Sequence, residues 1–200
     1  MAGSVLLGAG VGLVLTAKLG SDGYSTLLAG LADSTGLPYA VVNWTIGAVL
    51  VGTAWRFGQT PGVGTIVQPL IVGFVVNAIL DTVDTPHALV WRAVMLAAAA
   101  TLMAIGVATY LSTELGAGPV EAAARAFDPP VPFRWSYGIV QGGGALAGWR
   151  LGAPIGVGTL IVVFGLGPAV HLLMKRGSPA AQRMPIEPWQ PPSTLPDPGR

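Results

Sequence analysis

The sequence contains no cysteine, which excludes disulfide bonds, zinc-thiolate sites and cysteine nucleophiles. Charged residues are also scarce: they make up 10% of the 200 residues, whereas about 25% is typical of a soluble domain. The formal net charge of +1 gives no reason to expect a nucleic-acid partner. Because so few charged side chains cannot cover a surface that faces water, most of the surface is expected to face a lipid bilayer.

Long uncharged apolar stretches fill much of the chain, with 52% hydrophobic residues and a mean hydropathy of +0.65. Roughly 20 apolar residues are needed for a helix to cross the hydrocarbon core. The stretches therefore predict an all-α membrane protein with six transmembrane helices. These are expected at residues 1–17, 37–55, 65–80, 88–111, 133–149 and 158–174. Two further helices, at 20–33 and 116–127, are too short to cross and are expected to be interfacial or re-entrant.

One tetrapeptide, Gly-Val-Gly-Thr, occurs twice, at residues 62–65 and 156–159. A Trp-Arg pair precedes each copy at the same distance, at residues 55–56 and 149–150. Upstream matches extend the likeness, so the sequence predicts a duplicated unit. The first repeat is expected at 1–86 and the second at 87–176, each with three spans and one short helix. A proline-rich tail follows at 177–200, which is expected to be disordered and cytoplasmic.

Three spans in each repeat is an odd number, so the two repeats are expected to insert with opposite orientations. Such inverted repeats are used by many secondary transporters. The distribution of lysine and arginine favours both termini on the cytoplasmic side. That side would receive six basic residues, against Lys18, Arg92 and Arg150 outside. The first span is about a turn shorter than its counterpart, which favours a native start upstream of Met1 over a short helix that thins the bilayer.

Several spaced motifs agree in order with a known family of bacterial membrane proteins. They are Leu19-Gly20, Gly23-Tyr24, Thr35-Gly36-Leu37, Arg56, Pro61 to Thr65, Gly73 and Asp81, with Gly116 to Pro119 and Pro154 to Thr159 in the second half. In these the chain resembles the YczE/YyaS/YitT family of small integral membrane proteins. The resemblance implies a multi-pass protein of the bacterial cytoplasmic membrane, with transporter-like repeats and no assigned substrate. The family has Pro-Trp-Asp where this chain has Gly23-Tyr24-Ser25.

The two Gly-Val-Gly-Thr turns are the first candidate site. The glycines allow close backbone approach, and the threonine can cap the helix that begins there. The candidate residues are Gly62, Gly64, Thr65, Gly156, Gly158 and Thr159. One interpretation is a pair of helix N-termini that bind a polar or anionic ligand. The other is a pair of tight loops with a purely structural cap.

Three further polar residues are candidates for binding a solute. Glu121 lies one turn into the second short helix, where it is either a carboxylate in a buried cavity or a first-turn residue favoured by the helix dipole at the interface. Asn77 and His171 occupy matching positions in the third and sixth spans. They are either paired ligand contacts or side chains that form hydrogen bonds between helices.

No catalytic motif, metal-ligand set or cofactor signature is found in the sequence, so enzyme activity, metal and cofactor are not expected. The expected function is a small transporter or channel for a polar solute, with a site between the two repeats. The alternative is a non-transporting scaffold that supports a partner enzyme. A homodimer is also open, because six spans enclose little space. The glycine pairs Gly8/Gly12 and Gly144/Gly148 permit close contact either inside the protein or between copies.

Overall fold

The computed structural model describes residues 1–111, 118–127 and 130–177, with no description of the side chains of residues 111, 134 and 174–177. Within these residues the fold is all-helical, as the sequence predicts. The eight helices are α1 (Ala2–Ala17), α2 (Gly23–Thr35), α3 (Tyr39–Arg56), α4 (Val63–Thr82), α5 (Leu89–Leu111), α6 (Pro119–Ala126), α7 (Phe133–Arg150) and α8 (Val157–Gly177). Each expected helix is present, and the tail from residue 178 lies outside the described residues.

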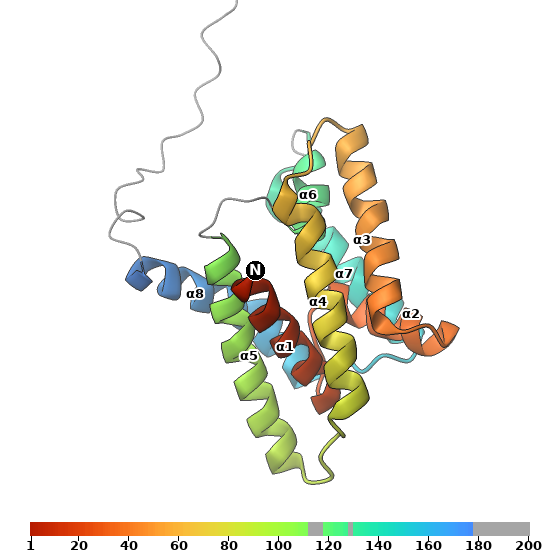
Figure 1. The fold of residues 1–200 in the computed structure, drawn as a ribbon, viewed down its shortest axis with the longest axis vertical. Coiled ribbons are helices and arrows are strands. Elements are labelled where there is room, and N and C mark those ends of the chain that lie inside the picture. Colours follow the sequence, from red (N-terminus) through yellow and green to blue (C-terminus); the bar gives the residue numbers. More distant parts are fainter. Residues whose placement is uncertain (112–117, 128–129, 178–200) are drawn as a thin grey trace, which may run out of the picture.

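Helices α1 and α5 pack side by side, with α4 on another side of α1 (Figure 1). Glycines allow these close contacts: a Cβ on Gly106 of α5 would lie 2.8 Å from the carbonyl oxygen of Gly3 on α1. On the α4 side, a Cβ on Gly12 would lie 2.8 Å from the Cβ of Ile79. The small residues of α1 are therefore used inside the protein, where any added side chain would separate the helices.

The two short helices each pack against the opposite half of the chain. Helix α2 contacts α7, and helix α6 contacts α3. The α2–α7 contact is close, because a Cβ on Gly30 would lie 2.8 Å from the carbonyl oxygen of Gly148. The contact between α1 and α4 also has a counterpart between α5 and α8. The α1–α4 contact and the short-helix contacts thus have counterparts in the second half, with the short helices exchanged. Within the described residues, the α3–α4 contact has no comparable counterpart between α7 and α8.

The outer surface carries many large apolar side chains. Examples are Phe74 on α4, Val90 on α5, Ile139 on α7 and Phe164 on α8, each more than two-thirds exposed. Among the described residues, Val63–Thr82 and Leu89–Tyr110 are long and apolar enough to cross a membrane, while Ala2–Ala17 and Val157–Leu173 are shorter apolar helices. The six crossings expected from the sequence therefore stay a prediction.

Candidate functional site

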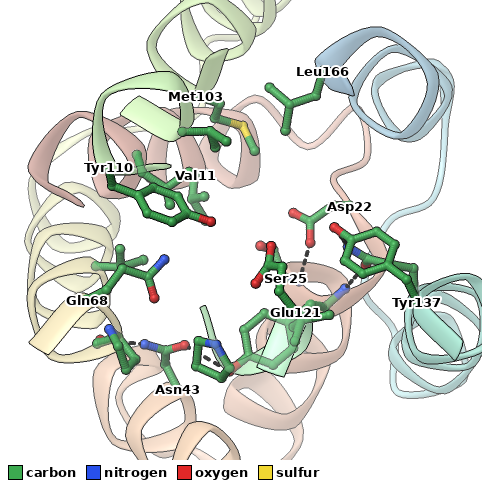
Figure 2. A pocket seen from close by; sticks show the side chains of 18 of the residues that line it. Val11, Asp22, Ser25, Asn43, Gln68, Met103, Tyr110, Glu121, Tyr137 and Leu166 are labelled. Carbon is green, nitrogen blue, oxygen red and sulfur yellow. Dashed lines mark hydrogen bonds between the residues drawn. The ribbon is translucent and has the colours of Figure 1, made fainter. Parts of the chain in front are cut away.

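A cavity of about 110 Å³ lies among the helices, and all eight contribute to its walls (Figure 2). A water molecule takes up about 30 Å³ in the liquid, so the cavity has room for about three or four waters or one small solute. Its lining is Leu7, Val11, Asp22, Tyr24, Ser25, Tyr39, Asn43, Gln68, Pro69, Val72, Met103, Val107, Tyr110, Pro119, Val120, Glu121, Tyr137, Gln141 and Leu166.

Both short helices begin at this cavity, and each brings a carboxylate to it. Asp22 is the N-cap of α2, where its Oδ2 accepts a hydrogen bond from the backbone N–H of Ser25 at 3.1 Å. Helix α6 begins after Gly118, with Pro119 in its first turn and Glu121 also in that turn. The Glu121 carboxylate accepts a hydrogen bond from its own backbone N–H. The two helix starts therefore place two acidic groups around one small space.

Burial raises the pKa of Glu121 above its ordinary value of 4.5, and the negative charge of Asp22 raises it further. The hydrogen bond from its own backbone and the positive charge of Arg125 oppose this shift. None of the described lining residues is a lysine, arginine or histidine. Among the described lining residues, there is thus no basic side chain to neutralise either carboxylate.

All four tyrosines of the chain line the same cavity. Tyr24 donates its hydroxyl hydrogen to the Oδ1 of Asn43 at 3.2 Å. The Tyr137 hydroxyl accepts a hydrogen bond from the Nε2 of Gln141 at 3.0 Å. Figure 2 shows the Tyr110 hydroxyl directed into the open space. The tyrosines therefore bring both aromatic rings and hydroxyl groups to the space beside the two carboxylates.

The remaining wall is aliphatic and comes mainly from α1, α4 and α5. It includes Leu7, Val11, Val72, Met103, Val107 and Leu166. Asn43 belongs to the polar side and is only 2% exposed, with its Nδ2 donating to the carbonyl oxygen of Pro69 at 2.7 Å. The cavity thus has an acidic, hydroxyl-bearing side and an apolar side.

Of the candidate site residues that the sequence offers, Glu121 is the one that lines the cavity. The second Gly-Val-Gly-Thr turn packs instead against the loop between α1 and α2, because the Gly158 N–H donates to the carbonyl oxygen of Leu19 at 2.8 Å. Thr159 accepts from the Gly156 N–H at 3.4 Å, across the first turn of α8. In the second Gly-Val-Gly-Thr copy, the geometry therefore matches a tight loop with a structural cap and not a ligand-binding helix N-terminus.

The other candidates lie away from the cavity lining. Gly62 is the N-cap of α4, and Gly64 and Thr65 belong to its first turn, while Gln68, one turn further on, does line the cavity. Asn77 donates its Nδ2 hydrogen to the Oδ2 of Asp81 at 2.7 Å, one turn along the same helix. His171 is exposed on α8.

Sequence reasoning missed Asp22, and a signal for it was available. Glu121 is the third residue after Gly118, and Ser25 is likewise the third after Asp22. The acidic residue is therefore at the N-cap in one short helix and three residues later in the other. The position in the first short helix that is equivalent to Glu121 is Ser25, so a comparison of equivalent positions finds no carboxylate there. The side chains of Asp22 and Glu121 nevertheless line the same cavity.

Comparison with known proteins places the chain in a family. The model of a family of unknown function, DUF6198, matches residues 1–175. The chain belongs to this family. Two relatives resemble it over most of their length: an uncharacterized membrane protein, YczE, of Bacillus subtilis is 28% identical over 189 residues, covering 86% of each chain. An uncharacterized protein of Haemophilus influenzae is 25% identical over 174 residues, covering 84% of this chain and 78% of its own. No solved structure matches. The resemblance to YczE that the motifs indicate is confirmed.

Proposed function

We propose that this protein crosses the bacterial cytoplasmic membrane six times, as two inverted repeats, and that it moves a small polar solute through the cavity between them. The observation that carries the proposal is the cavity itself, which all eight helices line and which holds two carboxylates. Intramembrane ionisable groups are expensive to bury and usually mark substrate or ion pathways. The membrane description of the Bacillus subtilis relative and the exposed apolar side chains support the location.

The exchanged packing of the short helices supports a pair of related repeats. The α2–α7 contact and the α6–α3 contact are the same contact with the halves reversed. Two repeats with three spans each must enter the bilayer in opposite directions if the chain crosses at every span. In many secondary transporters, inverted repeats of this kind form a substrate site near the bilayer midplane.

Two contacts of helix starts with the end of α1 and the loop after it agree with the proposed topology. With the N-terminus in the cytoplasm, the end of α1, the start of α5 and the start of α8 all lie on the outer side. Arg92 of α5 donates from Nε to the carbonyl oxygen of Ala17 at 2.7 Å and from Nη2 to that of Lys18 at 2.7 Å. The Gly158 N–H at the start of α8 donates to the carbonyl oxygen of Leu19. These contacts join segments that six crossings place on one side.

Solute flux into liposomes tests the proposal. The full-length protein is reconstituted, and swelling is followed by light scattering with isosmotic glycerol, urea or propylammonium chloride. Val11 is 4% exposed and lines the cavity, so Val11→Trp fills the route. Val5, on the same helix but 45% exposed, provides the control Val5→Trp.

We expect the native protein to accelerate entry of at least one of these solutes over protein-free liposomes. Val11→Trp should remove that acceleration, and Val5→Trp should retain it. Val107→Trp, at a partly buried position of the same wall, gives a second plug if Val11→Trp does not fold. Equal solute flux through the native protein, Val11→Trp and Val107→Trp would mean that the solute does not pass through the cavity.

A further inference from the structure

We infer that the cavity binds a small organic ammonium ion with a short apolar group. This inference rests on the proposed function and deepens it, because it names the chemical class of the solute. Three features carry it. Two carboxylates line the cavity with no basic side chain among the described lining residues. The N–H groups of Tyr24, Ser25 and Glu121 at the two helix starts are already bound. A second wall is built from aliphatic and aromatic side chains.

The charge balance of the cavity favours a cation. Asp22 and Glu121 both line it, and the described lining residues include no basic side chain. Burying a carboxylate without an opposite charge close by is costly even where it accepts hydrogen bonds, and a bound cation supplies that charge. An anion would instead meet two like charges in a space of about 110 Å³.

The helix starts offer acceptors to a ligand rather than donors. A helix N-terminus usually binds anions through its free N–H groups. In α2, the Tyr24 N–H is bound to the Oε1 of Gln141 at 2.8 Å, and the Ser25 N–H is bound to Asp22 at 3.1 Å. In α6, Pro119 has no N–H, and the Glu121 N–H is bound to its own side chain. A ligand at these helix starts therefore meets carboxylate oxygens, which accept hydrogen bonds from an ammonium group.

The other walls favour an organic ion over a metal ion. Ca²⁺ takes six to eight oxygen ligands and Mg²⁺ needs a near-octahedral set. Among the described residues, no three histidine, aspartate or glutamate side chains come together in a group that could hold a metal. The aliphatic wall suits an alkyl group, and aromatic rings attract an organic cation. A cavity of 150 Å³ holds benzene, so about 110 Å³ suits an ion of about four or five non-hydrogen atoms.

Titration calorimetry on the full-length protein in detergent tests this inference with four probes. Propylammonium chloride is the expected ligand, and 1-propanol, sodium propionate and potassium chloride are the neutral, anionic and inorganic comparisons. Asp22→Asn removes one charge but keeps a good N-cap for α2. Glu121→Gln removes the other charge. Asp33→Asn, at an exposed position of α2, is the matched control.

We expect propylammonium to bind at least about tenfold more tightly than each comparison probe, because hydrogen bonds to charged groups are the stronger ones. Asp22→Asn and Glu121→Gln should each weaken it by about tenfold or more, and Asp33→Asn should leave it unchanged. Equal or tighter binding of propanol, propionate or potassium, or unchanged affinity in Asp22→Asn, overturns the inference. If glycerol or urea flux is blocked by Val11→Trp while propylammonium does not bind, the transport proposal survives and the cation inference fails.

Discussion

Gln141 on α7 accepts a hydrogen bond from the backbone N–H of Tyr24 on α2 at 2.8 Å, although the two residues are 117 positions apart. The same side chain donates from Nε2 to the Tyr137 hydroxyl at 3.0 Å. Gln141 thereby ties the first short helix to the second half of the chain, directly beside the cavity. The arrangement of the acidic groups depends on this cross-contact, since Asp22 is the residue that begins α2.

Gln141→Leu should destabilise the protein by about 1–3 kcal/mol, because the partly buried Tyr24 N–H loses its acceptor. A loss of 1 kcal/mol lowers the melting temperature by about 2–4 °C for a chain of this size. The check is thermal unfolding of the full-length protein in detergent. Gln59→Leu, at an exposed loop position, is the control. Equal melting temperatures for both variants would mean that the cross-contact adds nothing to stability.

The α2–α7 packing predicts different effects for two neighbouring glycines of α7. A Cβ on Gly144 would lie 2.8 Å from the carbonyl oxygen of Gly23, whereas a Cβ on Gly143 meets nothing within 4 Å. Gly144→Ala should therefore cost about 1–3 kcal/mol through overpacking. Gly143→Ala should be neutral or stabilising, because alanine favours the helix. Denaturation of both variants in the same detergent decides this, and an equal loss in both would contradict the close packing.

The sequence predicted the helices well because glycine, proline and charge divide the apolar stretches clearly. Its choice of site residues was less complete, since the cavity arises from contacts between distant segments. Asp22 and Gln141 come together only because α2 packs on α7. The Gly-Val-Gly-Thr motif was the strongest repeat signal, yet in its second copy it holds a loop through Gly158. A repeated motif indicates that the two halves share an architecture. It does not identify the cavity, because the cavity is formed mainly by residues that differ between the halves.

Raising the pH should lower stability through Glu121. Because burial raises the pKa of this carboxyl in the folded protein, the folded state keeps its proton where the unfolded chain has lost it. Stability is then lost as the pH rises from 4.5, the ordinary value, through the raised pKa. Melting temperatures measured between about pH 4 and pH 8 should show this fall. In Glu121→Gln, the melting temperature should fall less between these pH values. If the variant shows the same fall as the native protein, the pH dependence belongs to other groups.

Affinity for propylammonium should change with pH in the opposite direction. Glu121 attracts the cation only when it is ionised, and an alkylammonium ion keeps its proton well above neutral pH, as lysine does. Calorimetry at several pH values above 4.5 should therefore show tighter binding as the pH rises. In Glu121→Gln the rise should be reduced. Affinity that falls as the pH rises would contradict an ionised Glu121 as the ligand.

Removal of residues 178–200 separates the transport proposal from the scaffold alternative. The cavity is lined by residues 7–166, so flux through it should not need this tail. We expect the truncated protein to match the full chain in the liposome assay. Loss of a partner enzyme in pull-downs of the truncated protein, with no flux through either form, would favour the scaffold.

The most direct test of the account uses the absence of cysteine from the chain. Phe57 and Leu151 directly follow α3 and α7, at equivalent positions of the two repeats, and both are exposed. Phe57→Cys and Leu151→Cys are made separately, and each is labelled in intact cells with a maleimide that does not cross the membrane. We predict that the Leu151→Cys variant is labelled from outside, and that the Phe57→Cys variant is labelled only after the cells are permeabilised. Labelling of both positions from the same side would contradict the inverted repeats.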